Sequence, residues 1–341
     1  LVCCVLNPDG SAEEEEGPYP STLSDAARFA GYAVERYGEC KAVVESAGNL
    51  WLEAYEAFEP KGVEVKPANP VQTRAVAEAR VKTDRVDARA LAHPLRAELI
   101  AGCYAPGREV GESRAVLSHR MNPTRELTRI KSRVHSLLDR YDLSCEYGDI
   151  FGVNGTGWLR SPGLNGRDQL LLQSLLRQVE SLQEEVRVAN SATARDAVGS
   201  RYAAVIMSMT GFDCYSASLL SAYVADVSRF PSPERLVSWA GLCPSVRQSG
   251  DSLHMGRMKG GSTRVRWIMV QAASAAVRSD TRMRAFYERK LKRHDHNAAL
   301  THVANRMLRV LWHMLREGRL YDERRERLYR SKLKRMMGVA A

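Results

Sequence analysis

A serine and three carboxylates in this chain of 341 residues have the types and spacing to carry chemistry. The serine is Ser249, in a polar passage with several glycines that runs from Trp239 to Trp267. A serine hydroxyl can attack a phosphodiester while cations hold the phosphate. Arg247 is close to it in the sequence, and Lys259, Arg264 and Arg266 lie a short loop away. Because a serine beside a glycine is common, the passage also fits an ordinary solvated loop.

The carboxylates are Glu45, Asp84 and Asp87. Glu45 closes a predicted strand, and the two aspartates lie three residues apart at a predicted helix start, hence on one face. Strand ends build sites in α/β layers, and Mg²⁺ is bound by few carboxylates together with phosphate oxygens. The set therefore predicts a Mg²⁺ site. The alternative is structural: Asp84 stabilises the helix N-terminus, and Asp87 pairs with Arg85 or Arg89.

The elements that must position these carboxylates lie in residues 1–105. Short apolar strands alternate there with amphipathic helices, which predicts an α/β layer domain. We expect Ser24 to cap the first helix and the acidic run 13–16 to stay in a loop. The periodicity predicts strands at 1–6, 42–44 and 63–65, and helices at 25–37, 50–58 and 71–91.

Residues 106–198 are predicted to form a helical coiled-coil connector. Apolar side chains step by three and four residues through two seams, at 127–141 and 172–186, with a glycine-rich loop at 148–166 between them. Pro123 should start or kink the first helix. The seams predict antiparallel pairing within the chain or pairing across a dimer.

Positive charge is concentrated near the C-terminus. The net charge is +10, and residues 281–341 hold 17 lysines and arginines against 6 acidic residues. Such an arm is typical of a polyphosphate partner, or it is a solvated helix face. The same two interpretations apply to Arg129 and Arg133 on the outer face of the first seam. The basic arm comprises Arg324, Arg325, Arg327, Arg330, Lys332, Lys334 and Arg335.

Residues 199–341 predict a helical second domain, so the fold class is α/β plus all-α. The turn 209–212 between two helices resembles a helix-hairpin-helix, which can present backbone N–H groups to phosphate. No run of about 18 apolar residues and no secretion leader is evident, which favours a cytoplasmic protein without membrane contact. The seven cysteines form no CxxC pair, which argues against a zinc site or a disulfide framework.

Four stretches together resemble one family, the insertion-sequence transposases of the IS-one-ten type. These join a DEDD, RuvC-like N-terminal domain to a C-terminal domain with a catalytic serine. Their order and separation make the resemblance specific. The stretches are VVESAGN around Glu45, NPVQTRAVAEARVKTDRVDARALA at 69–92, ELTRIKSRVHSLLDRY, and RFPSPERLVSWAGLCPSVRQSGDSLHMGRMKGGSTRVRW.

The resemblance implies an RNase H/RuvC-like first domain and a DNA recombinase guided by a structured RNA that pairs with target and donor DNA. Glu45, Asp84 and Asp87 would take the second, third and fourth acidic positions and bind Mg²⁺. Ser249 would form a phosphoserine link to DNA. The two domains of different subunits would share a composite site in a homo-oligomer associated with the bacterial nucleoid. On physical grounds, the expected phosphate contacts are Lys82, Lys259, Arg264 and Arg266.

One departure bears on activity. The first aspartate of the family lies on a strand that should precede Leu1, so we expect a truncated copy or a start-site error, with impaired catalysis. Two other functions fit the residues: a metal-dependent RuvC-like nuclease in which Ser249 is structural, and an inactive nucleic-acid-binding remnant. A Ser249→Ala variant distinguishes the nuclease from the recombinase, since a recombinase would lose its covalent DNA adduct whereas a nuclease would keep cutting.

Overall fold

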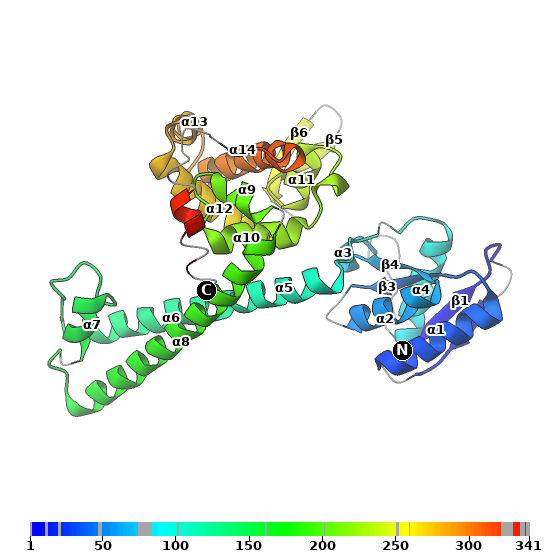
Figure 1. The fold of residues 1–341 in the computed structure, drawn as a ribbon, viewed down its shortest axis with the longest axis horizontal. Coiled ribbons are helices and arrows are strands. Elements are labelled where there is room, and N and C mark those ends of the chain that lie inside the picture. Colours follow the sequence, from blue (N-terminus) through cyan, green and yellow to red (C-terminus); the bar gives the residue numbers. More distant parts are fainter. Residues whose placement is uncertain are drawn as a thin grey trace. The chain divides into compact units, whose positions relative to one another are not determined.

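A computed structural model shows a largely helical chain with three two-stranded sheets in its described part (Figure 1). The contacts divide it into two compact units, residues 1–106 and 107–341. The predicted connector falls in the same unit as the C-terminal domain, and the three-part division stays a prediction. The structure describes residues 2–10, 13–19, 22–46, 50–73, 83–100, 102–160, 162–200, 202–249, 252–258, 260–321, 330–334 and 338.

The first unit contains an antiparallel hairpin and a parallel strand pair, both with helices against them. Its strands are β1 (Cys3–Leu6), β2 (Glu13–Glu16), β3 (Lys41–Glu45) and β4 (Glu64–Ala68). Its helices are α1 (Leu23–Tyr37), α2 (Leu50–Phe58), a 3₁₀ turn η1 (Glu59–Lys61), α3 (Pro70–Thr73) and α4 (Asp84–Arg96).

The parallel pair confirms the α/β prediction for this unit. β3 pairs with β4, and α2 is the crossover between them, as parallel strands require. The core beside them is formed by α1 and α2, with Phe29 and Phe58 in ring contact at 6.0 Å and Val65 of β4 buried. For the predicted helix 71–91, the structure shows α3 at its start and α4 over its end. Residues 74–82 between them lie outside the described part.

The prediction that residues 13–16 stay in a loop is wrong. They form β2, which pairs antiparallel with β1 from Cys3 opposite Glu16 to Leu6 opposite Glu13. A hairpin strand needs backbone hydrogen bonds, and its side chains need not be apolar where they meet solvent or cations. Glu14 accepts hydrogen bonds from Arg36 and Tyr37 of α1, at 2.9 and 2.6 Å.

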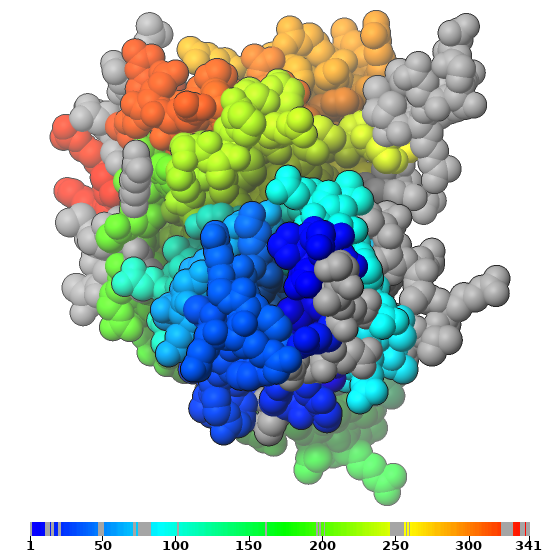
Figure 2. All heavy atoms as spheres, turned by 90° about the vertical axis from the view of Figure 1, so that its right-hand side faces the viewer, coloured from blue at the N-terminus to red at the C-terminus, as the bar shows by residue number. Residues whose placement is uncertain are grey.

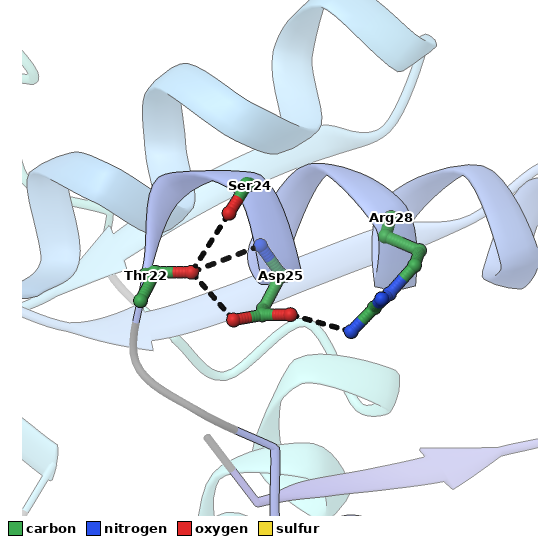
Figure 3. Close-up of polar contacts among 4 residues, drawn as sticks. All are labelled: Thr22, Ser24, Asp25 and Arg28. Atoms are coloured by element: carbon green, nitrogen blue, oxygen red, sulfur yellow. Dashed lines mark hydrogen bonds and ion pairs between the residues drawn. The ribbon is translucent and has the colours of Figure 1, made fainter.

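The predicted cap of α1 is also wrong. The N-cap is Thr22, whose hydroxyl accepts a hydrogen bond from the Asp25 backbone N–H at 3.2 Å (Figure 3). Ser24 lies inside the first turn, where its hydroxyl meets that of Thr22 at 3.0 Å. Asp25 adds negative charge at the helix N-terminus and pairs with Arg28, which favours the helix start.

We predict that Thr22→Ala destabilises the first unit by about 1 kcal/mol, because one helix N–H loses its acceptor. Ser24→Ala is the matched control: it removes the hydroxyl two residues away, which caps no backbone group in this helix start, and should change stability by less than about 0.5 kcal/mol. Urea unfolding followed by circular dichroism measures both. Equal losses for the two variants would restore Ser24 as the cap.

The second unit is helical apart from one hairpin. Its helices are α5 (Arg108–His119), α6 (Met121–Asp139), α7 (Val153–Leu159), α8 (Gly166–Gly199), α9 (Ala203–Ser208), α10 (Cys214–Val224), a 3₁₀ turn η2 (Val227–Arg229), α11 (Pro233–Trp239), α12 (Thr263–Ser279), α13 (Thr281–Leu291) and α14 (His296–Glu317). The hairpin strands are β5 (Pro244–Ser249) and β6 (Ser252–Met258). No helix in the described residues is long and apolar enough to cross a bilayer.

The two predicted seams pair within the chain. α6 and α8 pack along each other as an antiparallel helical arm, with Ile130 and Val134 of α6 buried against Leu172 and Val179 of α8 (Figure 1). Pro123 lies in the first turn of α6, where proline is tolerated, so it starts this helix. The glycine-rich segment between the seams contains a short helix, α7, which the sequence did not predict.

A larger core lies under the C-terminal helices. α12 and α14 pack against each other, and α10, α11 and α13 surround them. The turn at 209–212 connects α9 to α10 as predicted, but it is enclosed: Met209 and Phe212 are each 1% exposed. The backbone of this turn is therefore packed inside the core instead of lying open to a phosphate.

Candidate functional site

Glu45 is the last residue of β3 and is exposed. It lies opposite Ala68 of β4, so the carboxyl ends of the two parallel strands meet here. The chain is held in place directly after it, because both the backbone N–H and the hydroxyl of Ser46 donate to the Ala68 carbonyl, at 2.9 and 2.8 Å. Burial raises the pKa of the neighbouring Cys103 thiol, and a hydrogen bond with Ser46 lowers it in part.

Asp84 and Asp87 lie in the first turn of α4, as predicted. Thr83 is the N-cap, and its hydroxyl accepts a hydrogen bond from the Val86 N–H at 3.3 Å. Asp84 is exposed and Asp87 is half-buried. Two carboxylates at a helix N-terminus also favour the helix dipole, so this position agrees with the structural interpretation as well as with a metal site.

The three carboxylates belong to one unit, and α4 packs against β3. Their oxygens are the ligand type that Mg²⁺ prefers. Within the described residues, however, no group of three or more His, Cys, Asp or Glu side chains is arranged to hold a metal ion. The donor chemistry fits a hard divalent cation, but Glu45, Asp84 and Asp87 do not form a preassembled ligand group.

Ser249 is the last residue of β5, and its passage is a β-hairpin, whereas the sequence predicted a polar loop. β5 pairs antiparallel with β6, with Arg247 opposite His254 and Ser249 opposite Ser252. The second domain is therefore not all-α. The register places the Ser249 backbone at the tip of the hairpin, next to residues 250–251, which lie outside the described part.

The base of this hairpin is fixed to the helical core. The Ser262 N–H donates to the Trp239 carbonyl at 3.2 Å, and Ser262 then caps α12. The Asn305 side chain of α14 donates to the Leu242 carbonyl at 3.1 Å. Gly261 lies directly against Gly241: a Cβ on Gly261 would be 2.3 Å from the Gly241 nitrogen. Three helices, α11, α12 and α14, thus position the Ser249 strand at its base.

Two of the predicted phosphate contacts lie in the first turn of α12. Arg264 is exposed and donates to the Tyr223 hydroxyl at 3.2 Å. Arg266 is half-buried, and its guanidinium donates to the Gly241 carbonyl at 3.5 Å. Arg264 therefore offers its charge to solvent near the hairpin base, while Arg266 also stabilises the packing of that base.

The other predicted contacts are less informative. Arg129 and Arg133 are exposed on α6, and Arg129 forms an ion pair with Glu126 at 2.6 Å. Lys82 and Lys259 lie outside the described residues. Much of the basic arm does too, but Lys332 is described, and its ammonium donates to the Met207 carbonyl at 3.0 Å. At least this residue of the arm anchors the chain to the core.

Comparison with known families matches both units. A DEDD-type family described as "Transposase" matches residues 1–142, which include all three carboxylates, and "Transposase IS116/IS110/IS902 family" matches residues 203–288, which include the Ser249 hairpin. The chain belongs to the IS110/IS116/IS902 family of transposases. Within this family member, the carboxylates and the serine thus lie in the two separate matched regions.

Curated relatives point to the same kind of element. The chain is 29% identical over 178 residues to the IS110 uncharacterized 43.6 kDa protein of Streptomyces coelicolor, and 32% over 150 residues to the IS900 uncharacterized 42 kDa protein of Mycobacterium paratuberculosis. It is 25% identical over 196 residues to a putative transposase of Sinorhizobium fredii. These matches cover 52%, 43% and 57% of this chain, but only 44%, 38% and 48% of the relatives. The chain therefore spans less than half of the curated relatives it matches.

Proposed function

We propose that this chain acts as the transposase of an insertion sequence, a DNA recombinase that cuts and rejoins DNA as directed by a structured guide RNA. The observation that carries the proposal is the pair of family matches in chain order, one on the unit with the carboxylates and one on the unit with the Ser249 hairpin. In this proposal the first unit has an RNase H/RuvC-like fold. The parallel β3–β4 pair with its α2 crossover supports that assignment.

Ser249 is the proposed nucleophile. Its Oγ would form a bond to phosphorus while one phosphorus–oxygen bond to deoxyribose breaks, leaving a phosphoserine link and a sugar hydroxyl that takes up a proton. The fixed base of the β5–β6 hairpin supports this role, because a nucleophile needs a defined position. Arg264 is open to solvent in the first turn of α12, which follows the hairpin, and it would bind a phosphate.

Glu45, Asp84 and Asp87 would bind the metal, which we propose is Mg²⁺. When bound, such an ion supplies Lewis-acid stabilisation of charge on phosphate oxygens. Mg²⁺ needs only one or two carboxylates when phosphate oxygens complete its shell, so an incomplete protein ligand group is compatible with binding alongside DNA. The proposed partners are donor and target DNA, a guide RNA and further copies of this chain.

The test is a joining assay with donor DNA, target DNA, the guide RNA and Mg²⁺. We expect a joined DNA product that disappears in EDTA. The double variant Asp84→Asn, Asp87→Asn should lower product formation at least about 100-fold, because metal stabilisation of several kcal/mol is lost and about 1.4 kcal/mol is a factor of ten. The double variant Glu35→Gln, Glu39→Gln, which changes two exposed carboxylates of the same unit, should leave it unchanged. Absence of product from the unmodified chain contradicts the proposal.

A nucleic-acid-binding protein without catalysis is the second candidate. It is favoured by the lack of a preassembled three-ligand group in the described residues. Salt-sensitive DNA binding that persists without any cleavage in Mg²⁺ would support this candidate over the recombinase.

A further inference from the structure

α13 and the segments that flank it carry an unusual set of cations. They are Arg282, Arg289, Lys290, Lys292, Arg293 and Arg306, of which all but the half-buried Lys290 are exposed. We name these six residues the α13–α14 cationic surface. Across the part of the chain that the structure describes, none of the six forms an ion pair with a carboxylate. The arginines at Arg108, Arg187 and Arg319, by contrast, each pair with a glutamate.

Three of these cations gather around one aromatic ring. The charged groups of Arg306, Lys290 and Arg289 lie 4.8, 5.7 and 5.8 Å from the centre of the Phe286 ring. The electron-rich face of a ring attracts each cation, but it does not neutralise the repulsion among them. Phe286 therefore holds three positive charges close together, and none of them forms an ion pair with a carboxylate in the described residues.

The nearby aspartates have other roles. Asp280 is 3% exposed and accepts hydrogen bonds from the N–H groups of Arg282 and Met283 at the start of α13. Asp295 accepts from the Ala298 N–H as the cap of α14. Burial, and then the charges of Lys290 and His294, lower the pKa of His302, which is a separate sign of positive potential here. The local excess of positive charge thus remains available to an external anion.

We propose that the α13–α14 cationic surface binds the sugar–phosphate backbone of duplex DNA without reading its bases. Arg282 and Arg289 are two helical turns apart, about 10 Å along the axis, so a polyanion with closely spaced charges can engage both ends of α13. In Figure 2 the gold and orange atoms of α13 and α14 lie at the surface of the C-terminal unit. This inference deepens the proposed function and rests on it only for the choice of DNA.

An anionic membrane is the other polyanion to consider, and the packing of α13 argues against it. A helix that lies in a bilayer surface inserts an apolar face. The apolar side of α13 is already used: Met283 is buried, and Phe286 and Tyr287 pack against the C-terminal core. Of the large apolar side chains of α13, Leu291 is exposed, at 44%, and one such side chain does not make an apolar face.

The test compares two triple variants with equal loss of charge. One is Arg289→Gln, Lys292→Gln, Arg293→Gln. The control is Arg108→Gln, Arg187→Gln, Arg319→Gln, which removes three arginines that already have carboxylate partners. Binding of the full chain to a short DNA duplex of arbitrary sequence is measured by fluorescence anisotropy in EDTA, over a series of salt concentrations. Circular dichroism confirms that both variants fold.

We expect the surface variant to bind at least about tenfold more weakly at about 0.1 M salt, and its slope of log K against log salt to fall by about 2 to 3, since each phosphate contact contributes about 0.9. The control should change neither quantity comparably. Equal losses in the two variants, no loss in the surface variant, or tighter binding to phosphatidylserine vesicles than to duplex would each overturn the proposal. Because this binding is measured without metal or joining, a failed joining assay would remove the proposed recombinase and leave this surface standing.

Discussion

Ser249→Ala is expected to abolish the covalent link between protein and DNA and to lower strand joining at least about 10³-fold, because no other atom at that position can form the phosphoester bond. The structure places Ser249 at the end of β5, opposite Ser252 of β6. The measurement is denaturing electrophoresis of labelled DNA after incubation with the chain, guide RNA and Mg²⁺, which resolves protein-linked strands from free ones.

Ser252→Ala is the matched control, because Ser252 lies opposite Ser249 in the hairpin register and carries the same hydroxyl. We expect this variant to keep the adduct. If the Ser249→Ala variant still cuts DNA, and neither the variant nor the unmodified chain forms an adduct, the chain is a metal-dependent nuclease that uses water. If Ser252→Ala alone loses the adduct, the nucleophile lies on the opposite strand.

Gly261→Ala should be the more damaging of two neighbouring substitutions at the hairpin base. A Cβ on Gly261 would lie 2.3 Å from the Gly241 nitrogen, 2.5 Å from the Gly241 Cα and 2.8 Å from the Trp239 carbonyl oxygen, all of them backbone atoms. Relief requires the hairpin base to separate from α11, in addition to the strain of a positive φ of 72°. We expect a loss of about 3 kcal/mol or more in the free energy of unfolding, and loss of joining activity.

Gly260→Ala measures the cost of the positive φ separately from the cost of the steric contact. Gly260 has nearly the same φ, 74°, but a Cβ there would have nothing within 4 Å. Its cost should therefore be about 1 kcal/mol, from the left-handed backbone conformation alone. Urea unfolding of the two variants and the joining assay supply the comparison. Similar stabilities for both would show that the contact between Gly261 and Gly241 does not hold the hairpin in place.

The parts of the fold that could be predicted were those in which the spacing of apolar residues fits a single type of element, a helix or a strand. The periodicities of β3, α2 and β4 gave the βαβ arrangement, and the seams at 127–141 and 172–186 gave the α6–α8 pairing. β2 was missed because its four glutamates carry no apolar signal, and its pairing with β1 depends on backbone hydrogen bonds. Thr22 was passed over in favour of Ser24 because both are good caps and lie two residues apart.

For the candidate site, the sequence located Glu45 at a strand end and both aspartates at a helix start, and the structure confirms these positions. It did not reveal the hairpin around Ser249. A signal was present, since Gly250-Asp251 stands between two stretches of strand-forming length, as in a two-residue hairpin connection. The roles of Arg266 and Lys332 as donors to backbone carbonyls could not be found, because those carbonyls are distant in sequence.

α8 is one uninterrupted helix of 34 residues, about 50 Å long, without an internal proline. Leu172 and Val179 near one end pack in the arm with α6, and Ala194 and Ala197 near the other are buried in the core that includes α12 and α14. α8 is therefore a continuous rigid connection between the arm and the C-terminal core. A displacement at the tip of the arm would be carried by α8 to α9 and α10, which it contacts in the C-terminal core, because α8 itself contains no loop that could absorb the displacement.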